Sequence, residues 1–329
     1  MRDAYIVQSV RTPGCKQKRG LFNQTRPEEL ISFIMKAAVE KTPNLKPEHI
    51  NDIMLGCAFP EAEQGINLGR LAGQMAGFPE SVSGATVNRF CASGLEAIAL
   101  ATMRVQAGWS EVTMGAGVES MTYVPMGGNK PCPHPEYSAT NPEAYISMGI
   151  TAENVANRYN ISREDQDKFA SESQAKAAKA RDNGLFTEIV PTPAYKYVLQ
   201  ADGTYKKEQF IVEHDDGIRE SSPEGLGKLR AVFAANGSVT AGNSSQTTDG
   251  AAATIIASKE ACDKLGLTPI GRLVTYATIG CKSDEMGVGP RYAIPQALKQ
   301  AGLSIEDIDI YEINEAFASQ ALYSIRELG

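Results

Sequence analysis

The sequence has few cysteines and histidines and no long apolar segment. Its 329 residues include six cysteines, none of them in a Cys-x-x-Cys pair, and three histidines. Scattered cysteines argue against a disulfide framework and a structural metal site, and they fit the reducing environment of the cytoplasm. No apolar run approaches the roughly 20 residues of a membrane-spanning helix. Met1, Arg2 and Asp3 run directly into apolar residues, so we also expect no secretory or organellar leader and no membrane contact.

The charge balance is acidic. There are 32 basic and 39 acidic residues, for a formal net charge of −7, and no basic stripe is evident. This composition argues against a general affinity for nucleic acid. The hydrophobic fraction of 42% is ample for a core, and the length suggests two domains or one large α/β unit.

The first part of the chain alternates apolar strands with amphipathic helices. Residues 4–10, 50–55 and 112–118 have the pattern of buried strands, and residues 68–77 and a segment opened by Pro27 have that of helices. Strands and helices that alternate at this pace predict a mainly parallel sheet covered on both faces.

The composition changes near Thr122 and recovers its α/β pattern near Asp249. We therefore expect residues 1–118 to form an N-terminal α/β unit, completed by about residues 247–268. Residues 119–246 would form an inserted loop domain that carries ligand contacts.

The end of the chain resembles its beginning. Residues 303–311 match residues 45–53, and residues 271–277 match the first strand. This predicts a second α/β unit over residues 269–329, incomplete because its counterpart of the segment around Cys91 would fall after Gly329.

Cys91 stands between a predicted short strand and a predicted helix. Ser93 and Gly94 suit a tight turn there, and free amides at a helix N-terminus favour a thiolate, the attacking form of cysteine. Small neighbours and a turn glycine allow close approach to the sulfur. The alternative is a buried structural cysteine.

Several separated motifs together resemble the thiolase family, whose members make or cleave 3-ketoacyl-CoA. They are Asn-Arg-Phe-Cys-Ala-Ser-Gly at 88–94, Gly-Ala-Gly-Val-Glu-Ser-Met at 115–121, Met-Gly-Ile-Thr-Ala-Glu-Asn at 148–154, Gly-Asn-Ser-Ser at 242–245 with Asp-Gly-Ala-Ala at 249–252, and Asn-Glu-Ala-Phe at 314–317. The resemblance covers the whole chain. It implies the thiolase-like layered α/β fold and a dimer or tetramer.

The resemblance also implies roles for six residues. Cys91 would be acylated by the CoA substrate, and Asn314 would hold a water that helps to bind the thioester oxygen. Ser245 would contact the pantetheine arm and Arg219 the adenine, while Met148 and Phe233 would line the acyl pocket. CoA would be a substrate, and no metal or organic cofactor is implied. Ser147 replaces a histidine of some short-chain members, which favours a broader acyl chain length.

Simpler interpretations stay open for most of these residues. Asn314 could be a helix N-cap, Ser245 a turn residue and Arg219 a solvated surface charge. The family's Gly-His-Pro motif and its second cysteine, in a Cys-x-Gly motif, are absent from the sequence, and none of the three histidines has that setting. The leading hypothesis is an acyltransferase that works through an acyl-Cys91 intermediate, converting 3-ketoacyl-CoA and CoA into acetyl-CoA and a shortened acyl-CoA, or the reverse. The alternatives are a truncated, impaired thiolase that only binds CoA or a partner subunit, and a condensing enzyme of the ketoacyl-synthase type.

Overall fold

The computed structural model describes residues 2–329, which form two compact units. The first contains residues up to 131, residues 186–217 and residues 247–273, and the second contains the remaining segments 132–185, 218–246 and 274–329. The strands of the first unit are β1 (Ala4–Arg11), β2 (Cys15–Lys16), β3 (Asp52–Gly56), β4 (Ser83–Val87), β5 (Val112–Glu119), β6 (Thr192–Leu199), β7 (Tyr205–Val212) and β8 (Thr248–Ser258). Its helices are α1 (Pro27–Glu40), α2 (Leu68–Met75), α3 (Ser93–Gln106) and α8 (Lys259–Leu265).

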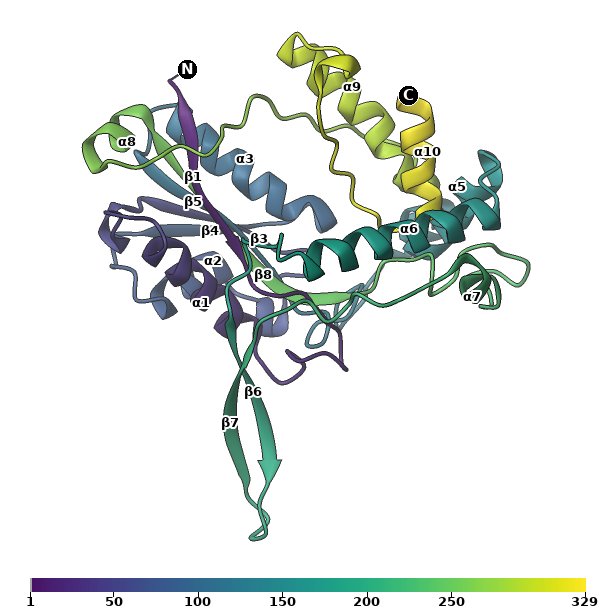
Figure 1. The fold of residues 1–329 in the computed structure, drawn as a ribbon, viewed down its shortest axis with the longest axis horizontal. Coiled ribbons are helices and arrows are strands. Elements are labelled where there is room, and N and C mark those ends of the chain that lie inside the picture. Colours follow the sequence, from purple (N-terminus) through teal and green to yellow (C-terminus); the bar gives the residue numbers. More distant parts are fainter. Residues whose placement is uncertain (1) are drawn as a thin grey trace. The chain divides into compact units, whose positions relative to one another are not determined.

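The main sheet of the first unit has the order β1-β8-β5-β3-β4, with the short β2 beside β8 (Figure 1). β3 is parallel to β4 and β5, but β8 is antiparallel to both β5 and β1. The expectation of a mainly parallel sheet is therefore wrong, and the sheet is mixed. The reason is that β8 enters the sheet after a long excursion of the chain and runs opposite to β5, which a helical crossover between neighbouring strands would not produce.

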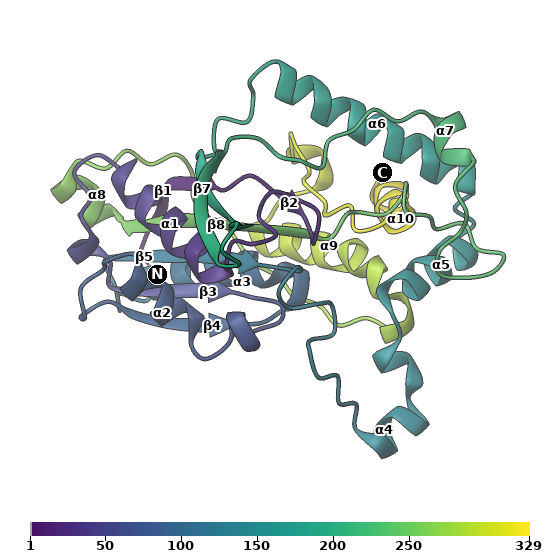
Figure 2. The ribbon, with the colours of Figure 1, turned by 90° about the horizontal axis from the view of Figure 1, so that it is seen from below.

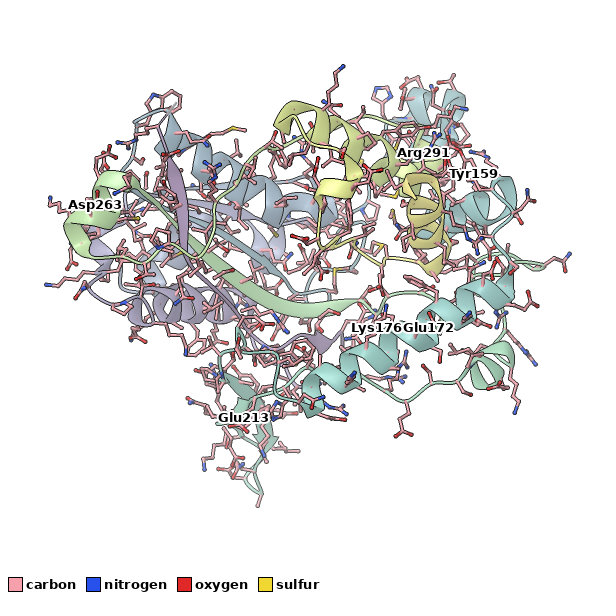
Figure 3. All side chains as sticks on the ribbon, turned by 45° about the horizontal axis from the view of Figure 1, so that its top comes forward. Tyr159, Glu172, Lys176, Glu213, Asp263 and Arg291 are labelled. Carbon is pink, nitrogen blue, oxygen red and sulfur yellow. The ribbon has the colours of Figure 1, made fainter. Side chains whose placement is uncertain are left out.

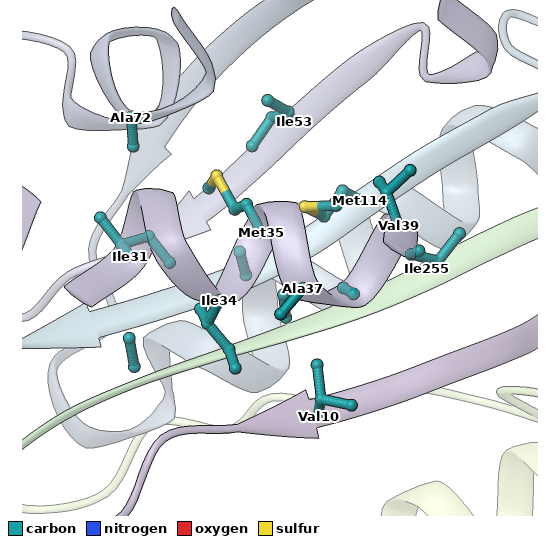
Figure 4. Packing of buried hydrophobic residues seen from close by; sticks show 14 of the residues in the cluster. Val10, Ile31, Ile34, Met35, Ala37, Val39, Ile53, Ala72, Met114 and Ile255 are labelled. Carbon is teal, nitrogen blue, oxygen red and sulfur yellow. The ribbon is translucent and has the colours of Figure 1, made fainter. Parts of the chain in front are cut away.

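Helix α1 covers one face of this sheet. Its first turn is favoured by Pro27 and by Glu29, whose carboxylate accepts the Arg26 amide hydrogen at 3.1 Å. Ile34 and Met35 on this helix are fully buried, and the cluster around them draws on β1, β3, β5, β8 and α2 (Figure 4). The stripe of apolar residues predicted in this region thus forms the larger core of the unit.

Helix α3 covers the opposite face of the sheet (Figure 2). Ala97, Ala101 and Val105 on α3 pack against Met54 of β3 and Ile256 of β8. Small residues on the buried side let the helix lie close to the strands, as its composition predicts. The sheet is therefore covered on both faces, which confirms the layered α/β architecture.

The hairpin β6–β7 extends away from the main sheet (Figure 1). Two aspartates in the segment that follows the hairpin bind it to the chain around β2. Asp215 accepts the Gly14 amide hydrogen at 2.7 Å and pairs with Arg11, and Asp216 accepts the Lys16 amide hydrogen at 2.6 Å.

The second unit is helical. Its helices are α4 (Pro135–Thr140), α5 (Met148–Arg158), α6 (Arg163–Asp182), α7 (Pro223–Gly227), α9 (Gly289–Ala301) and α10 (Ala318–Leu328). Serine side chains cap three of them: Ser147 accepts the Ile150 amide hydrogen, Ser162 that of Asp165 and Ser222 that of Gly225. α6 is polar on most sides, and Glu172 and Lys176 extend from its surface (Figure 3). None of the helices among residues 2–329 has the length and apolar character to span a bilayer.

The predicted strands of the final segment are wrong. Residues 271–277 contact the sheet through one isolated bridge, between Gly271 and Ile6, and residues 308–311 form no strand among the described residues. A strand requires a continuous hydrogen-bonded neighbour, and a repeat read from the sequence does not supply one. The expected division into an inserted domain and a second α/β unit stays a prediction.

Candidate active site

Cys91 lies on a single-turn 3-10 helix, Phe90–Ala92, which connects β4 to α3. The expected strand and helix on either side are present. The turn falls at 90–92, and Ser93 is already the first residue of α3. Cys91 therefore stands just before the N-terminus of a long helix on the first unit.

The buried side chain of Ser93 holds this turn together. Its hydroxyl oxygen accepts the Arg89 amide hydrogen at 2.8 Å, and the hydroxyl donates to the Phe90 carbonyl oxygen at 2.6 Å. Phe90 has a φ of 46°, a left-handed conformation that a bulky residue seldom adopts. Local strain of this kind persists only where neighbouring contacts impose it, so the position of Cys91 is closely determined.

Cys91 itself is exposed, in contrast to the buried Cys15, Cys57 and Cys262. This rules out the interpretation as a sealed structural cysteine. The atoms packed around the sulfur nevertheless remove part of its water and raise the pKa of the thiol. The Cys91 backbone amide lowers the pKa, and the Glu119 carboxylate raises it further. The expected preference for thiolate at this helix start is therefore wrong, because desolvation outweighs the amide contribution.

Glu119 ends β5 and joins the loop after β3 to this region. Its carboxylate accepts the amide hydrogens of Ala58 at 2.7 Å and Phe59 at 3.3 Å, and a side-chain hydrogen of Gln64 at 2.8 Å. The Cys57 thiol also donates to it at 3.7 Å. Desolvation raises the pKa of Glu119 despite these donors. Glu119 belongs to a quoted motif, but nothing in the sequence marked its electrostatic effect on Cys91.

The second unit brings Ser245 beside the Asn-Glu-Ala-Phe segment. The Ser245 amide donates to the Ala316 carbonyl oxygen at 2.9 Å, the Ala318 amide donates to the Asn243 carbonyl oxygen at 2.9 Å, and Ser244 and Phe317 form a bridge. Ser245 is exposed. Two motifs separated by about 70 residues therefore meet side by side, as residues of one binding surface would.

An aromatic pair lies against the start of α5 in the same unit. The Phe233 and Phe317 rings meet edge to face with centroids 6.0 Å apart, and the Phe233 ring lies directly on Gly149. Met148, the preceding residue, is half-buried. Phe233 therefore contacts Phe317 as Ser245 contacts Ala316, and Met148 directly precedes the glycine beneath the Phe233 ring.

Two predicted residues have fewer contacts. Asn314 is exposed and is not the N-cap of α10, a position that Phe317 takes, so the simpler interpretation as a cap is wrong. Next to it, the Ser173 hydroxyl donates to the Glu315 carboxylate at 2.6 Å. Arg219 is exposed, and its amide donates to the Gln174 side chain of α6 at 3.0 Å. Cys91 belongs to the first unit and these residues to the second.

The histidines occupy ordinary structural positions. His49 accepts the Lys46 amide hydrogen through Nδ1, and His134 caps α4 and pairs with Glu136 at 3.2 Å. His214 is exposed. Within the described residues, no three of the side chains that commonly bind metals cluster closely enough to hold an ion.

Comparisons with known proteins agree with these motifs. The model of the thiolase N-terminal domain matches residues 4–260, and that of the thiolase C-terminal domain matches residues 267–329. The 3-ketoacyl-CoA thiolase of Bacillus subtilis is 44% identical over 331 residues, which cover 100% of this chain and 84% of that protein. The chain belongs to the thiolase family. A peroxisomal 3-ketoacyl-CoA thiolase of Mus musculus is also 44% identical, over 99% of this chain and 76% of that protein.

Solved thiolase structures share the fold. The acetyl-CoA acetyltransferase of Bacillus anthracis superimposes with a TM-score of 0.88 at 34% identity, over 100% of this chain and 84% of that one. The dimeric peroxisomal thiolase of Saccharomyces cerevisiae gives a TM-score of 0.86 at 34% identity, over 99% of this chain and 82% of that one. These matches confirm the thiolase-like α/β fold.

Proposed function

We propose that this protein is a thiolase-family acyltransferase that moves acyl groups between 3-ketoacyl-CoA and CoA through an acyl-Cys91 intermediate. The observation that carries the proposal is that Cys91 is exposed on the 3-10 turn just before α3, in a chain of the thiolase family. The family models favour a thiolase over a condensing enzyme of the ketoacyl-synthase type.

The chemistry begins at that sulfur. In the degradative direction the Cys91 thiolate adds to the 3-keto carbon, the bond between carbons 2 and 3 breaks, and the two-carbon part leaves as acetyl-CoA after it gains a proton. The sulfur of a second CoA then takes the acyl group from Cys91. Because its surroundings raise the pKa of Cys91, the first step requires a base. The resemblance assigns that task to the histidine of a Gly-His-Pro motif, which this sequence does not contain.

The remaining site assignments are also proposals. Asn314 would position a water against the developing oxyanion, Ser245 would contact pantetheine and Arg219 the adenine, and Met148 and Phe233 would line the acyl pocket. The contact of Phe233 with Phe317 and the hydrogen bond from Ser245 to Ala316 support the places of Phe233 and Ser245 in this set. CoA serves as substrate, and we propose no further cofactor.

We also propose a homodimer or homotetramer located in the cytoplasm. The six unpaired cysteines fit a reducing compartment, and the matched B. subtilis protein comes from a bacterium, whereas the matched mouse protein is peroxisomal. One solved relative is described as dimeric. Fractionation of the source cells would test the location.

Two assays test the proposed function. Mass spectrometry after incubation with acetyl-CoA should show one acetyl group on Cys91, and the Cys91→Ser variant should show none there. A thiolysis assay with acetoacetyl-CoA and CoA then measures the complete cycle. Full turnover by the Cys91→Ser variant would exclude the proposal, and a protein that acquires acyl groups without turning over would support the impaired alternative.

A further inference from the structure

One face of α5 contacts a single loop at two points. Gly149 and Glu153 are four residues apart, so they lie on the same side of the helix. Both are buried, and both contact residues 233–239. These two residues, named here the α5 clamp, belong to the second unit together with the loop.

Gly149 receives the Phe233 ring. A Cβ atom built on Gly149 would lie 2.1 Å from the nearest ring carbon, far inside van der Waals contact. Only glycine lets the ring lie directly on the helix backbone. The same ring also meets Phe317, at 6.0 Å between centroids. The absence of a side chain at Gly149 therefore determines how far Phe233 stands from α5.

Glu153 fixes the other end of the loop. Its carboxylate accepts the amide hydrogens of Ser238 at 2.9 Å and Val239 at 3.0 Å, and the Ser238 hydroxyl donates to it at 3.3 Å. The side chain is only 3% exposed. A buried carboxylate that satisfies two backbone amides holds them strongly, because charged acceptors form the stronger hydrogen bonds.

The two contacts are connected through the loop itself. The Val232 amide donates to the Val239 carbonyl oxygen at 3.0 Å, and Ala231 and Thr240 form an antiparallel bridge. Glu153 thus fixes Val239, Val239 fixes Val232, and the next residue, Phe233, returns to Gly149. These contacts attach the loop to α5 at both Val239 and Phe233, and so restrict where the Phe233 ring can lie.

We propose that the α5 clamp sets the acyl chain length that this protein accepts, by fixing Phe233. The inference rests on the proposed function, in which Phe233 lines the acyl pocket. Gly149 acts as a specificity-determining residue and Glu153 as a positioning residue, and neither takes part in the chemistry. A ring displaced from the helix would occupy space that a long acyl chain needs and a short chain does not.

The test compares the binding of two acyl-CoA esters to the whole protein by isothermal titration calorimetry. For the Gly149→Ala variant we expect the Kd for decanoyl-CoA to rise about tenfold relative to that for butyryl-CoA, the discrimination that small changes in an apolar pocket produce. Glu153→Gln should shift the same ratio in the same direction by a smaller factor. Gly289→Ala on α9 is the matched control, because a Cβ there meets nothing within 4 Å.

Each result decides between the interpretations. An unchanged ratio in folded Gly149→Ala and Glu153→Gln would overturn the clamp while leaving the proposed function intact, provided that Cys91 still becomes acetylated. If Gly149→Ala does not fold, Phe233→Ala replaces it and should shift the ratio in favour of decanoyl-CoA. A wild-type protein that binds neither ester overturns both the clamp and the proposed function.

Discussion

Cys91 combines an accessible sulfur with surroundings that keep the thiol protonated. Its neighbours remove water from the sulfur, and the Glu119 carboxylate adds a negative charge nearby. A thiol with a raised pKa is mostly protonated and unreactive near neutral pH, and it becomes a nucleophile when a base removes its proton. Such an arrangement protects the protein from unwanted alkylation in the absence of substrate.

The first prediction concerns alkylation of Cys91 by iodoacetamide. The thiolate is the reacting form, so a raised pKa means that the rate at Cys91 keeps increasing as the pH rises past the ordinary pKa of cysteine, near 8.5. Replacing Glu119 by Gln removes a charge that raises the pKa, and should increase the rate at pH 8 by about threefold. Peptide-resolved mass spectrometry would measure it.

Glu48→Gln is the control for this experiment, because Glu48 is exposed and its replacement removes the same formal charge. Its rate at Cys91 should equal that of the wild type. A rate that is already constant from pH 7 upward would contradict the raised pKa.

The second prediction concerns Ser93. Replacing it by Ala removes the hydroxyl from both hydrogen bonds and releases the strained turn. We expect the free energy of unfolding to fall by about 1–3 kcal/mol, from the loss of two hydrogen bonds that contribute about 0.5–1.5 kcal/mol each. Urea unfolding followed by circular dichroism would measure it. Ser81→Ala, at an exposed serine of the same unit, should change little, and an equal loss in both variants would refute the assignment.

Among the elements, α1 contributes the most to the larger core. It spans β1, β8, β5 and β3 from one side, so its buried residues join strands that are far apart in sequence (Figure 4). The third prediction follows: Ile34→Ala, at a residue with no exposed surface, should lower the free energy of unfolding by about 2–5 kcal/mol.

Ile270→Ala is the matched control for Ile34, since Ile270 is 64% exposed. We expect a change within about 0.5 kcal/mol there. The comparison is made by thermal unfolding of both variants. A small effect at Ile34 would mean that the core tolerates a cavity next to α1.

The elements also show what sequence patterns can reveal. The period of apolar residues found α1, α2 and α3, because burial of one helix face leaves that signature. It found β1, β3, β5 and β8 for the same reason. The pattern did not predict the direction of β8, because the alternation of apolar residues carries no information on pairing partners. It also predicted a strand at residues 271–277, where no neighbouring strand supplies the hydrogen bonds.

The candidate site shows the same division. Cys91, Ser245 and residues 314–317 could be located from motifs, because the family's motifs keep their order along the chain. The pKa of Cys91 could not, because it depends first on how far folding buries the sulfur and then on Glu119 from another strand. Glu153 was visible in a motif, but its hydrogen bonds to the loop 85 residues later are a product of folding.

For the whole molecule, one edge of the main sheet is open. β4 pairs with β3 and has no second neighbour among residues 2–329. Phe90 and Leu95, which follow it in the chain, are 63% and 53% exposed. Open edges and apolar surface of this kind are usually covered in assemblies, and we expect a second copy of this chain to cover this one in the dimer proposed above.

The fourth prediction tests that assembly. If this edge forms the proposed dimer, Leu95→Glu should yield a monomer, because it places a charge in the expected apolar contact, and light scattering coupled to gel filtration would measure the mass. Leu199→Glu on the β6–β7 hairpin, at a residue that is 60% exposed, is the control and should remain dimeric. A Leu95→Glu protein that stays dimeric would place the interface elsewhere.

The pairing of β1 with β8 has a consequence for synthesis of the protein. β1 begins at Ala4, and its neighbour in the sheet runs to Ser258, so the first strand leaves the ribosome long before its partner exists. Until then the backbone hydrogen-bonding groups and apolar residues of β1 remain exposed in the nascent chain. Chaperones bind exposed segments of this kind. Slow translation between these two strands would therefore prolong the period in which this protein is most prone to aggregate.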